Sequence, residues 1–334
     1  MRIVTLEEHF NLPDFIKRIP KEVIAERGWP NEQNASPLMQ KAQALLPEFG
    51  EERLSSMDKN GISVQVLSVS GPGADLLSGE DGIRLAQDYN NILAQKMAAY
   101  LNRFAAFAHL PMLDPRAAAD ELERTVKDLG FCGAMINGMS NNLFLDDASF
   151  SPVLSKAQEL DVPIYLHPNF PPKAVRDLYY SNLPGALNQV LASAGFGWHA
   201  ETAIHILRMV AAGTFDRFPK LQIIIGHMGE TLPFMMARSE NGLSKELRQS
   251  NRSLSEILKQ QVHITTSGFF TLPPLMTAIE TFGIDRIMFS VDYPFSPNQK
   301  GKAFLESLDL PAEDMEKLTH GNADKLLKLV KKAL

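Results

Sequence analysis

The sequence predicts an α/β protein built as a closed (β/α)₈ TIM barrel. Short apolar stretches recur eight times along the chain, amphipathic stretches separate most of them, and the apolar stretches are suited to burial on both faces. Strands that alternate with helices and are covered on both faces form a parallel sheet. Eight such units favour a closed barrel over an open sheet, and the turn at Gly71 lacks the GxGxxG spacing typical of doubly wound folds.

The eight predicted strands share a run of apolar or β-branched residues that ends in polar or glycine-containing punctuation. In chain order they cover residues 2–9, 63–70, 103–111, 132–138, 162–168, 221–229, 262–268 and 286–294. The stretches between most of them have helical period. One of these begins at Asp114 followed by Pro115, which is typical of a helix N-terminus.

Two connections are longer than a barrel needs. Residues 10–50 follow the first predicted strand, and residues 169–198 follow the fifth. Both leave from the carboxyl ends of strands, the face where barrel enzymes keep their active sites. We therefore predict insertions after strands 1 and 5 that serve as lids or oligomer contacts. Because the chain shows no internal repeat, low-complexity tract or linker, we expect residues 1–334 to form one domain.

Composition narrows the classes of partner and compartment. The chain has 334 residues, 45% of them hydrophobic, and a net charge of −6, which gives no reason to expect nucleic acid or an anionic membrane as partner. Its single cysteine, Cys132, excludes an intramolecular disulfide and a thiolate zinc site built by this chain alone. Without a leader-like start or an apolar run of membrane-spanning length, we expect a cytoplasmic protein.

Potential metal ligands stand at the carboxyl ends of four predicted strands. The carboxyl ends of parallel strands meet at one mouth of a barrel, so we expect these side chains to converge. In the opening IVTLEEHF, strand alternation points Glu7 and His9 to one side and Glu8 to the other. Imidazoles and carboxylates together suit a divalent ion such as zinc or manganese, with positions left for substrate and water. The candidates are Glu7, His9, His167, His227 and Asp292.

Each candidate also has a plain structural interpretation. The first strand could end in solvated polar residues, His167 before Pro168 could hydrogen-bond a turn, and Asp292 could be a turn residue. The joint position of the candidates at one face of the barrel favours the metal site. Of the other histidines, we expect His109 to be packed and hydrogen-bonded. We interpret the remaining ones as structural or surface residues, and these are His199, His205, His263 and His320.

Several segments together resemble a known family. LEEHF, YLHPNF, IIIGHMGE, TTSGFF, FSVDYPF and HGNADKLLKL are similar to the amidohydrolase superfamily, and within it to the metal-dependent aromatic acid decarboxylases typified by γ-resorcylate (2,6-dihydroxybenzoate) decarboxylase. The resemblance runs from residue 3 to about residue 330, and the ExH opening in place of HxH marks the decarboxylase branch. It implies a carboxy-lyase of aromatic compound metabolism that decarboxylates an ortho-hydroxybenzoate-type acid.

The resemblance also implies roles for individual residues. His227 and Glu230, spaced as H-x-x-E, would form a hydrogen-bonded pair beside the metal and take part in catalysis. Asp292 would protonate the ring carbon before the C–C bond breaks. One divalent ion, Mn²⁺ or Zn²⁺, would be bound by Glu7, His9, His167 and Asp292.

For the substrate, the resemblance implies contacts from Arg238 and Asn137. The fourth predicted strand ends INGMS, without the lysine that bridges two metals in many hydrolytic members, which implies a mononuclear site. Phe269 in TSGFF stands where the family has a polar residue, so the ring substituents stay open. The resemblance further implies a small aromatic carboxylic acid as substrate and a homodimer or homotetramer.

Two other function classes stay open at this point. The same metal could lower the pKa of a bound water, with Asp292 as base, so that the protein hydrolyses a lactone, ester or amide. A non-catalytic barrel that binds a metal or a small ligand is the third class, because a fold alone never proves an activity. The resemblance, the ExH opening and the missing lysine weigh against the hydrolase, and the presence of every expected ligand weighs against the non-catalytic barrel.

Overall fold

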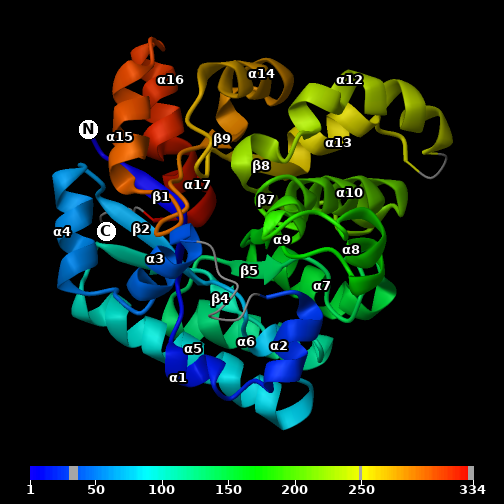
Figure 1. Cartoon of the computed structure of the whole chain (residues 1–334). Coiled ribbons are helices and arrows are strands. Elements are labelled where there is room, and N and C mark those ends of the chain that lie inside the picture. Colours follow the sequence, from blue (N-terminus) through cyan, green and yellow to red (C-terminus); the bar gives the residue numbers. More distant parts are fainter. Residues whose placement is uncertain (30–36, 248–249, 330–334) are drawn as a thin grey trace.

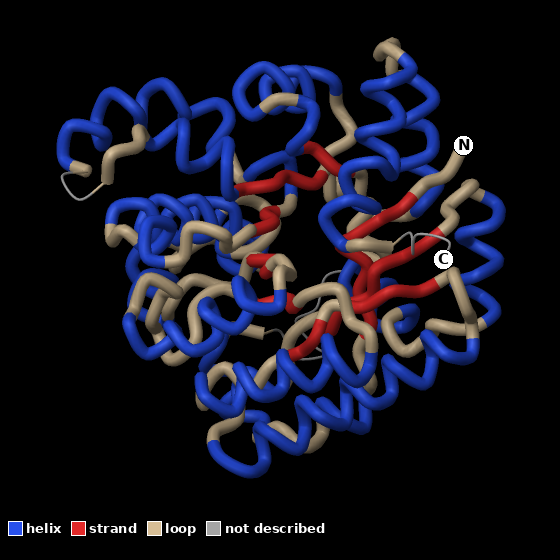
Figure 2. The backbone as a smooth tube through the Cα atoms, turned by 180° about the vertical axis from the view of Figure 1, so that it is seen from behind, coloured by secondary structure: helices blue, strands red, loops and turns tan. Residues whose placement is uncertain are grey.

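The computed structural model describes residues 1–29, 37–247 and 250–329 and shows an α/β fold of parallel strands and helices (Figure 1). The strands lie in the interior and the helices surround them (Figure 2). Each of the eight predicted stretches contains strand residues, and the third contains two short strands. The α/β class and the parallel arrangement predicted from the sequence are confirmed.

The strands form two parallel sheets in which neighbours follow one another along the chain. The first sheet contains β1 (Val4–Phe10), β2 (Val64–Val69) and β3 (Phe104–Ala106). The second contains β4 (Ala108–His109), β5 (Ala134–Asn137), β6 (Ile164–His167), β7 (Ile223–Ile225), β8 (Val262–Thr265) and β9 (Ile287–Met288).

Two links connect these sheets. Only Phe107 separates β3 from β4, so one stretch of chain contributes to both sheets. At the other side, Glu8 forms a parallel bridge with Tyr293, which lies beyond the end of β9. The His9 N–H donates to the Tyr293 carbonyl at 2.6 Å. The first strand of one sheet therefore lies beside the chain that continues the last strand of the other.

Helices follow most of the strands. The predicted start at Asp114 is confirmed, because its side chain accepts the Ala117 N–H at 3.1 Å and Pro115 occupies the first turn of α6. The helices between and after the strands are α4 (Glu51–Lys59), α5 (Gly79–Ala99), α6 (Pro115–Leu129), α7 (Ser151–Leu160), α10 (Gly197–Ala211), α11 (Thr214–Arg217), α12 (Leu232–Leu243), α13 (Leu254–Gln261), α14 (Leu272–Phe282), α15 (Asn298–Ser307), α16 (Ala312–Glu316) and α17 (Asn322–Leu327).

The two long connections contain short helices. After β1 come α1 (Pro13–Ile16), α2 (Lys21–Arg27) and α3 (Pro37–Leu45). After β6, which is the fifth predicted strand, come α8 (Lys173–Tyr179) and α9 (Leu187–Ala192). The connections meet each other, because Arg27 of α2 donates to the Phe170 carbonyl and Arg176 of α8 donates to the Glu26 carbonyl.

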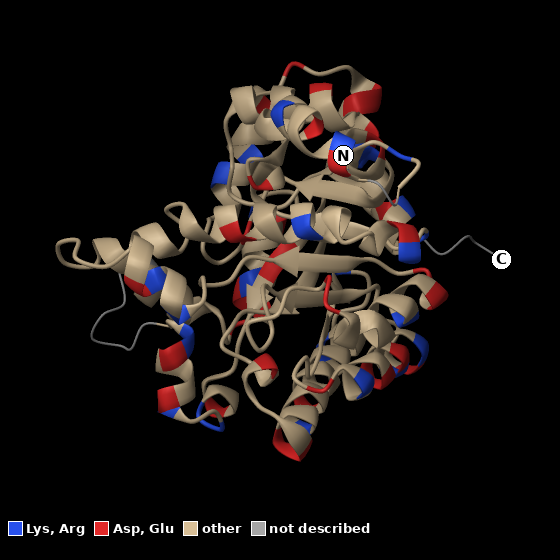
Figure 3. Cartoon of the chain, turned by 90° about the vertical axis from the view of Figure 1, so that its right-hand side faces the viewer, with Lys and Arg blue, Asp and Glu red and all other residues tan. Residues whose placement is uncertain are grey.

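Buried apolar side chains form two main layers. One layer fills the space between strands and helices. The other consists of residues that alternate with it along the strands, such as Val4 and Leu6 of β1 and Val64 and Val66 of β2. Charged residues of both signs are interspersed over the outer helices (Figure 3). Within the described ranges, no helix is both long and apolar enough to cross a membrane.

Candidate metal centre

Five side chains from the carboxyl ends of four strands face one point. Oε1 of Glu7, on β1, lies 3.2 Å from His167 Nε2, 3.4 Å from His227 Nε2 and 3.9 Å from His9 Nε2. Asp292 follows β9 and reaches the same point: its Oδ1 lies 3.4 Å from His9 Nε2, and its Oδ2 lies 4.0 Å from His227 Nε2. The structure thus brings together the candidates that lie far apart in the sequence.

The unpaired atoms at this point fit a cation. Within the described part of the chain, Glu7 Oε1 and His9 Nε2 are buried and make no hydrogen bond. Leaving such a group unsatisfied costs about 1–3 kcal/mol, unless a ligand occupies the position. Glu7, His9 and His167 each offer a ligand atom, and these atoms lie within 4.8 Å of one another. Carboxylate oxygen and imidazole nitrogen are ligands that manganese and zinc accept, so the residues fit one divalent ion.

Neighbouring hydroxyl groups fix these side chains in place. The second oxygen of Glu7, Oε2, accepts hydrogen bonds from the hydroxyls of Tyr165 and Ser267, which leaves Oε1 to face the imidazoles. Ser68 Oγ lies 3.2 Å from His9 Nδ1 and holds the outer nitrogen of that ring. Groups of this kind orient metal ligands in proteins. Burial raises the pKa of Glu7, but His227 and the other imidazoles outweigh burial and hold that pKa well below its usual value.

The backbone around the centre adopts uncommon conformations. His227, Ser267 and Asp292 have φ values of 48°, 33° and 68°, in a region that residues other than glycine rarely occupy. The pairing of β1 with β2 also shifts register between Thr5 and Glu8. Such conformations cluster at functional sites, where they direct side chains that regular strands would direct elsewhere. A Cβ atom at Gly226 would collide with the Glu7 carboxylate, so glycine is required there.

His227 and Glu230 form the predicted pair, and His199 extends it. His227 Nδ1 lies 2.7 Å from Glu230 Oε1, and Glu230 Oε2 lies 2.5 Å from His199 Nδ1. His199 comes from the first turn of α10, and its side chain is only 8% exposed. Burial raises the pKa of Glu230, but His227 and His199 outweigh burial and lower it. The interpretation of His199 as a structural or surface residue did not include this contact, because nothing near His199 in the sequence indicates that it lies beside the centre.

Burial also affects the acid at the centre. It raises the pKa of Asp292, and the negative charge of Glu7 adds to the rise, against the lowering effect of His9 and His227. The Asp292 side chain is 18% exposed, whereas Glu7 is fully buried. Asp292 is therefore the acid of the centre that holds a proton more readily.

The two predicted substrate contacts have different positions. Asn137 ends β5 directly beside His167, and its buried Oδ1 makes no hydrogen bond with the described residues. Arg238 is exposed on α12. Asn137 is thus next to the centre, whereas Arg238 is not brought together with it by the described contacts, and its contact with the substrate stays a prediction.

Aromatic rings lie around the imidazoles. The ring centroid of Trp198 is 6.5 Å from His167, that of Phe269 is 6.0 Å from His227, and that of Phe295 is 5.7 Å from His9. Trp29 and Phe170, from the two long connections, pack against Trp198. Flat apolar surfaces above a metal centre suit a planar ring.

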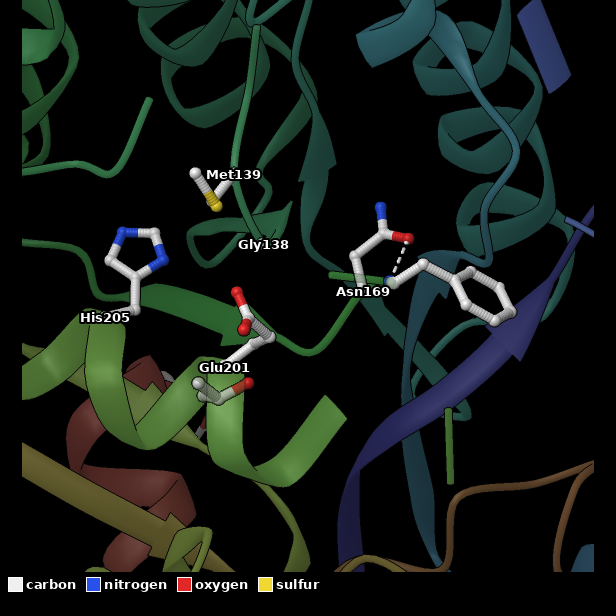
Figure 4. Close-up of a pocket in the computed structure, with 7 residues that line it drawn as sticks. Gly138, Met139, Asn169, Glu201 and His205 are labelled. Atoms are coloured by element: carbon white, nitrogen blue, oxygen red, sulfur yellow. Dashed lines mark hydrogen bonds between the residues drawn. The ribbon is translucent and has the colours of Figure 1, made fainter. Parts of the chain in front are cut away.

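A small cavity beside this wall is too small for a substrate. Figure 4 shows Asn169 and Glu201 among its lining residues, and Asn169 Oδ1 accepts the Phe170 N–H at 2.8 Å. The cavity volume is 10 Å³, about the space that one water needs. The lining residues are Gly138, Met139, Asn169, Phe170, Glu201, Thr202 and His205.

Four of the histidines expected to lie outside the centre have partners within the fold, and for His320 the partner is Asp324, whose Oδ2 lies 3.1 Å from His320 Nδ1. His109 Nε2 accepts the Ala74 N–H at 2.8 Å, and burial lowers its pKa to about 4. His205 Nε2 accepts the Leu145 N–H at 2.7 Å, and burial lowers its pKa to about 3. His263 lies at the amino end of β8, with its Nε2 3.1 Å from Gln222 Oε1. These residues fit the structural interpretation.

Comparisons with known proteins show the family to which the chain is similar. The family model described as "Amidohydrolase" matches residues 9–329. A γ-resorcylate decarboxylase of a Rhizobium species is 36% identical, over 98% of each chain, and a decarboxylase named orsB of Emericella nidulans is 38% identical over 85% of this chain and 87% of its own.

Solved structures give the same result. The crystal structure of a Rhizobium 2,6-dihydroxybenzoate decarboxylase has a TM-score of 0.86 and 33% identity, and the match covers 98% of this chain and 99% of that chain. A dihydroxybenzoic acid decarboxylase of a Polaromonas species, solved with bound manganese and the inhibitor 2-nitroresorcinol, also has a TM-score of 0.86 and 33% identity, with 99% and 98% covered. The resemblance inferred from the sequence motifs is confirmed.

Proposed function

This chain belongs to the amidohydrolase family, and we propose that it is a metal-dependent carboxy-lyase that removes carbon dioxide from an ortho-hydroxybenzoate-type acid. The observation that carries the proposal is the convergence of Glu7, His9 and His167 on one point, with the carboxylate of Asp292 beside it. The relatives at 36% and 38% identity, which bear the names of decarboxylases, support the same reaction.

One divalent ion, Mn²⁺ or Zn²⁺, would be held by Glu7, His9, His167 and Asp292. Bound there, the ion supplies a Lewis acid for the carboxylate and phenolate oxygens of the substrate. Glu7 and His9 offer the unpaired atoms that favour this assignment. The hydroxyls of Tyr165 and Ser267 keep the Glu7 carboxylate in a single orientation.

Asp292 delivers the proton that the reaction needs. The new C–H bond forms at the ring carbon that carries the carboxylate. The bond to the carboxylate then breaks, its electron pair restores the aromatic ring, and carbon dioxide leaves. A bound cation would lower the pKa of Asp292, so this carboxylate acquires its proton when the acidic substrate binds and brings one. The proton of the substrate acid thus ends on the product ring, and the reaction needs no redox partner.

His227 holds the phenolic oxygen of the substrate through Nε2, the nitrogen that faces Asp292 at 4.0 Å. Glu230 accepts a hydrogen bond from Nδ1 of the same ring, and this bond fixes which nitrogen carries the proton. His199 holds the other oxygen of Glu230. Asn137, with its unpaired Oδ1, accepts a hydrogen bond from a ring hydroxyl. We also propose that Arg238, which is exposed on α12, contacts the substrate.

The same proposal extends to the architecture. We propose that the two sheets form one closed (β/α)₈ barrel with insertions after β1 and β6, and the bridge between Glu8 and Tyr293 supports closure. We further propose that residues 1–334 are one domain, that the protein is a homodimer or homotetramer, and that it works in the cytoplasm.

A turnover assay tests the function. Protein loaded with manganese is incubated with a panel of ortho-hydroxybenzoic acids, and the loss of substrate absorbance and the release of carbon dioxide are followed. We expect at least one acid to be decarboxylated and a chelator to abolish the reaction. Silence across the panel, from protein shown to hold its metal, would contradict the proposal, and cleavage of a lactone by the same protein would favour the hydrolase.

A further inference from the structure

Glu8, the second acid of the EEH motif, takes no part in the proposed chemistry, yet it is fully buried. Its carboxylate contacts the turn that carries Asp292. The Val291 N–H donates to Oε1 at 2.9 Å, and the Tyr293 N–H donates to Oε2 at 3.1 Å. One carboxylate therefore holds the residues on both sides of the proposed proton donor.

The other contacts of Glu8 tie this turn to β1 and β2. Ser290 Oγ donates to Oε1 at 3.2 Å and accepts the N–H groups of Leu6 and Glu7 at 3.2 and 2.6 Å. Gln65 Nε2 donates to Oε2 at 3.4 Å. Glu8 thus accepts four hydrogen bonds, two through each oxygen: from the Val291 N–H and Ser290 Oγ to Oε1, and from the Tyr293 N–H and Gln65 Nε2 to Oε2.

A buried cation supports this carboxylate from behind. Arg53 of α4 is fully buried, and its Nη2 donates to the His9 carbonyl at 2.6 Å. Its Nη1 donates to Gln65 Oε1 at 3.4 Å, so Gln65 connects the guanidinium with Glu8. Hydrogen bonds and an opposite charge of this kind offset part of the cost of burying the carboxyl group, although burial still raises the pKa of Glu8 to about 7.

The turn needs such support because of its conformation. Asp292 has φ of 68°, and an aspartate keeps this left-handed conformation only where the surroundings fix it. β9 already ends at Met288, and beyond it two backbone hydrogen bonds reach the turn: the His9 N–H donates to the Tyr293 carbonyl at 2.6 Å, and the Ser296 N–H donates to the Asp292 carbonyl at 2.8 Å. Neither of them engages the N–H groups that Glu8 binds. The Tyr293 N–H belongs to the peptide group directly after Asp292, and the Val291 N–H belongs to the peptide group between Ser290 and Val291, so Glu8 holds the chain on both sides of the uncommon φ.

We propose that Glu8 is a positioning residue that fixes the turn 291–293 and thereby aims the Asp292 carboxylate at the metal centre. Its effect on turnover rests on the function proposed above, whereas its effect on the conformation of Asp292 does not. The role explains why the first strand carries two adjacent acids. Glu7 faces the metal centre, and Glu8, on the opposite face of the strand, holds the turn that carries Asp292.

The Glu8→Gln substitution tests this role. The amide has nearly the same shape, but its NH₂ group replaces one acceptor and meets the N–H of Val291 or Tyr293. We expect kcat to fall about 100-fold, the cost of misplacing a catalytic group by about 1 Å. The affinity for manganese should also fall, because Asp292 is one of the proposed ligands, so kcat is measured with the variant saturated in manganese. KM should stay near the wild-type value, a split from kcat that general loss of structure would not produce.

A matched control is Glu121→Gln. Glu121, on α6, is also a buried carboxylate, and it accepts hydrogen bonds from Asn90 on α5 and Arg124 on α6, away from the Asp292 turn. We expect this variant to keep the wild-type kcat. If Glu8→Gln does not fold, Glu8→Asp replaces it, because the shorter acid keeps the charge but cannot reach both N–H groups, and the same loss of kcat is expected.

A crystal structure of the manganese-bound variant gives a readout that does not depend on activity. We expect Asp292 to leave the left-handed region and its carboxylate to turn away from His9. If the wild type decarboxylates nothing but Asp292 moves in the variant, the proposed function fails and the positioning role stands. Unchanged kcat, or an Asp292 turn with wild-type φ in the variant, would overturn the positioning role.

Discussion

The buried histidines at the mouth and those elsewhere in the fold differ in what their ring nitrogens face. His109 and His205 each accept a backbone N–H through Nε2, and in His109 a single carboxylate oxygen, Asp75 Oδ1, lies 3.7 Å from the same nitrogen. His9, His167 and His227 point Nε2 at carboxylate oxygens instead. Burial is the same in both groups, so burial does not reveal a site. A site is revealed by nitrogens and carboxylate oxygens that face each other with a position left between them for a cation.

The largest effect on kcat is expected when Asp292 is replaced by an uncharged amide. Asp292→Asn keeps an oxygen that can face the metal but removes the proton donor. We expect kcat to fall by about 10³-fold, within the range of general acid catalysis. The measurement is turnover of an ortho-hydroxybenzoate by variant protein with its metal content determined. Near-normal turnover by folded, metal-loaded protein would refute Asp292 as proton donor.

Changing a proposed metal ligand and measuring metal binding distinguishes the residues of the metal centre from the buried histidines elsewhere. Glu7→Gln removes the charge that three imidazoles face. We expect the affinity for manganese to fall more than about 100-fold, because changes that only touch the surroundings of a ligand already cost 10–100-fold. Titration of metal-free protein with Mn²⁺, followed by electron paramagnetic resonance, measures this. The control His205→Leu should bind manganese as the wild type does.

A paired substitution separates the two groups of histidines. His199→Leu removes the hydrogen bond to Glu230, and we expect kcat to fall about 10-fold with little change in KM, since one oriented hydrogen bond of a catalytic pair is lost. His205→Leu leaves the Leu145 N–H unpaired and should lower the free energy of unfolding by about 1–3 kcal/mol without lowering kcat. Equal kcat in both variants would show that His199 has only a structural role.

The smallest effect concerns pH and the histidines outside the mouth. Burial lowers the pKa of His205 to about 3, below the value near 6.5 of an unfolded chain. The contribution of neutral His205 to the free energy of unfolding is therefore complete above pH 6.5. It is lost as the pH falls, because this histidine binds a proton in the unfolded chain but not in the folded protein. At pH 5 we expect the free energy of unfolding to be about 2 kcal/mol lower because of this histidine.

Urea unfolding at pH 7 and pH 5 measures this loss. The His205→Leu variant should lose about 2 kcal/mol less stability than the wild type between the two pH values, because it lacks the titrating group. Equal losses in the two proteins would contradict the assignment of His205 as a buried neutral histidine.

The sequence predicted the meeting of distant ligands because the carboxyl ends of parallel strands lie on one face. Glu7, His167 and Asp292 each end a recognisable strand stretch, so the order of strands alone was enough to place them together. His199 could not be placed in this way. It lies on a helix, and its position depends on the path of residues 169–198, which no periodicity predicts.

Other features depend on tertiary contacts that a sequence pattern does not contain. The left-handed φ of Asp292 and the hydrogen bonds of Glu8 arise from a turn after β9 meeting β1, 280 and more positions away in the chain. Strand alternation predicted that Glu8 points away from Glu7 and His9, but not what it would contact there. The exposure of Arg238 on α12 was likewise not readable from the motif that suggested it.

The most direct test of the metal centre is a titration of metal-free protein with Mn²⁺ while carbon dioxide release from 2,6-dihydroxybenzoate or a related acid is followed. We expect the rate to rise in proportion to added manganese, to level off at one ion per chain, and to fall to zero when a chelator removes the ion. A rate of carbon dioxide release that changes neither with added metal nor with chelator would contradict the account. The absence of any carbon dioxide release from protein that holds one ion per chain would contradict it as well.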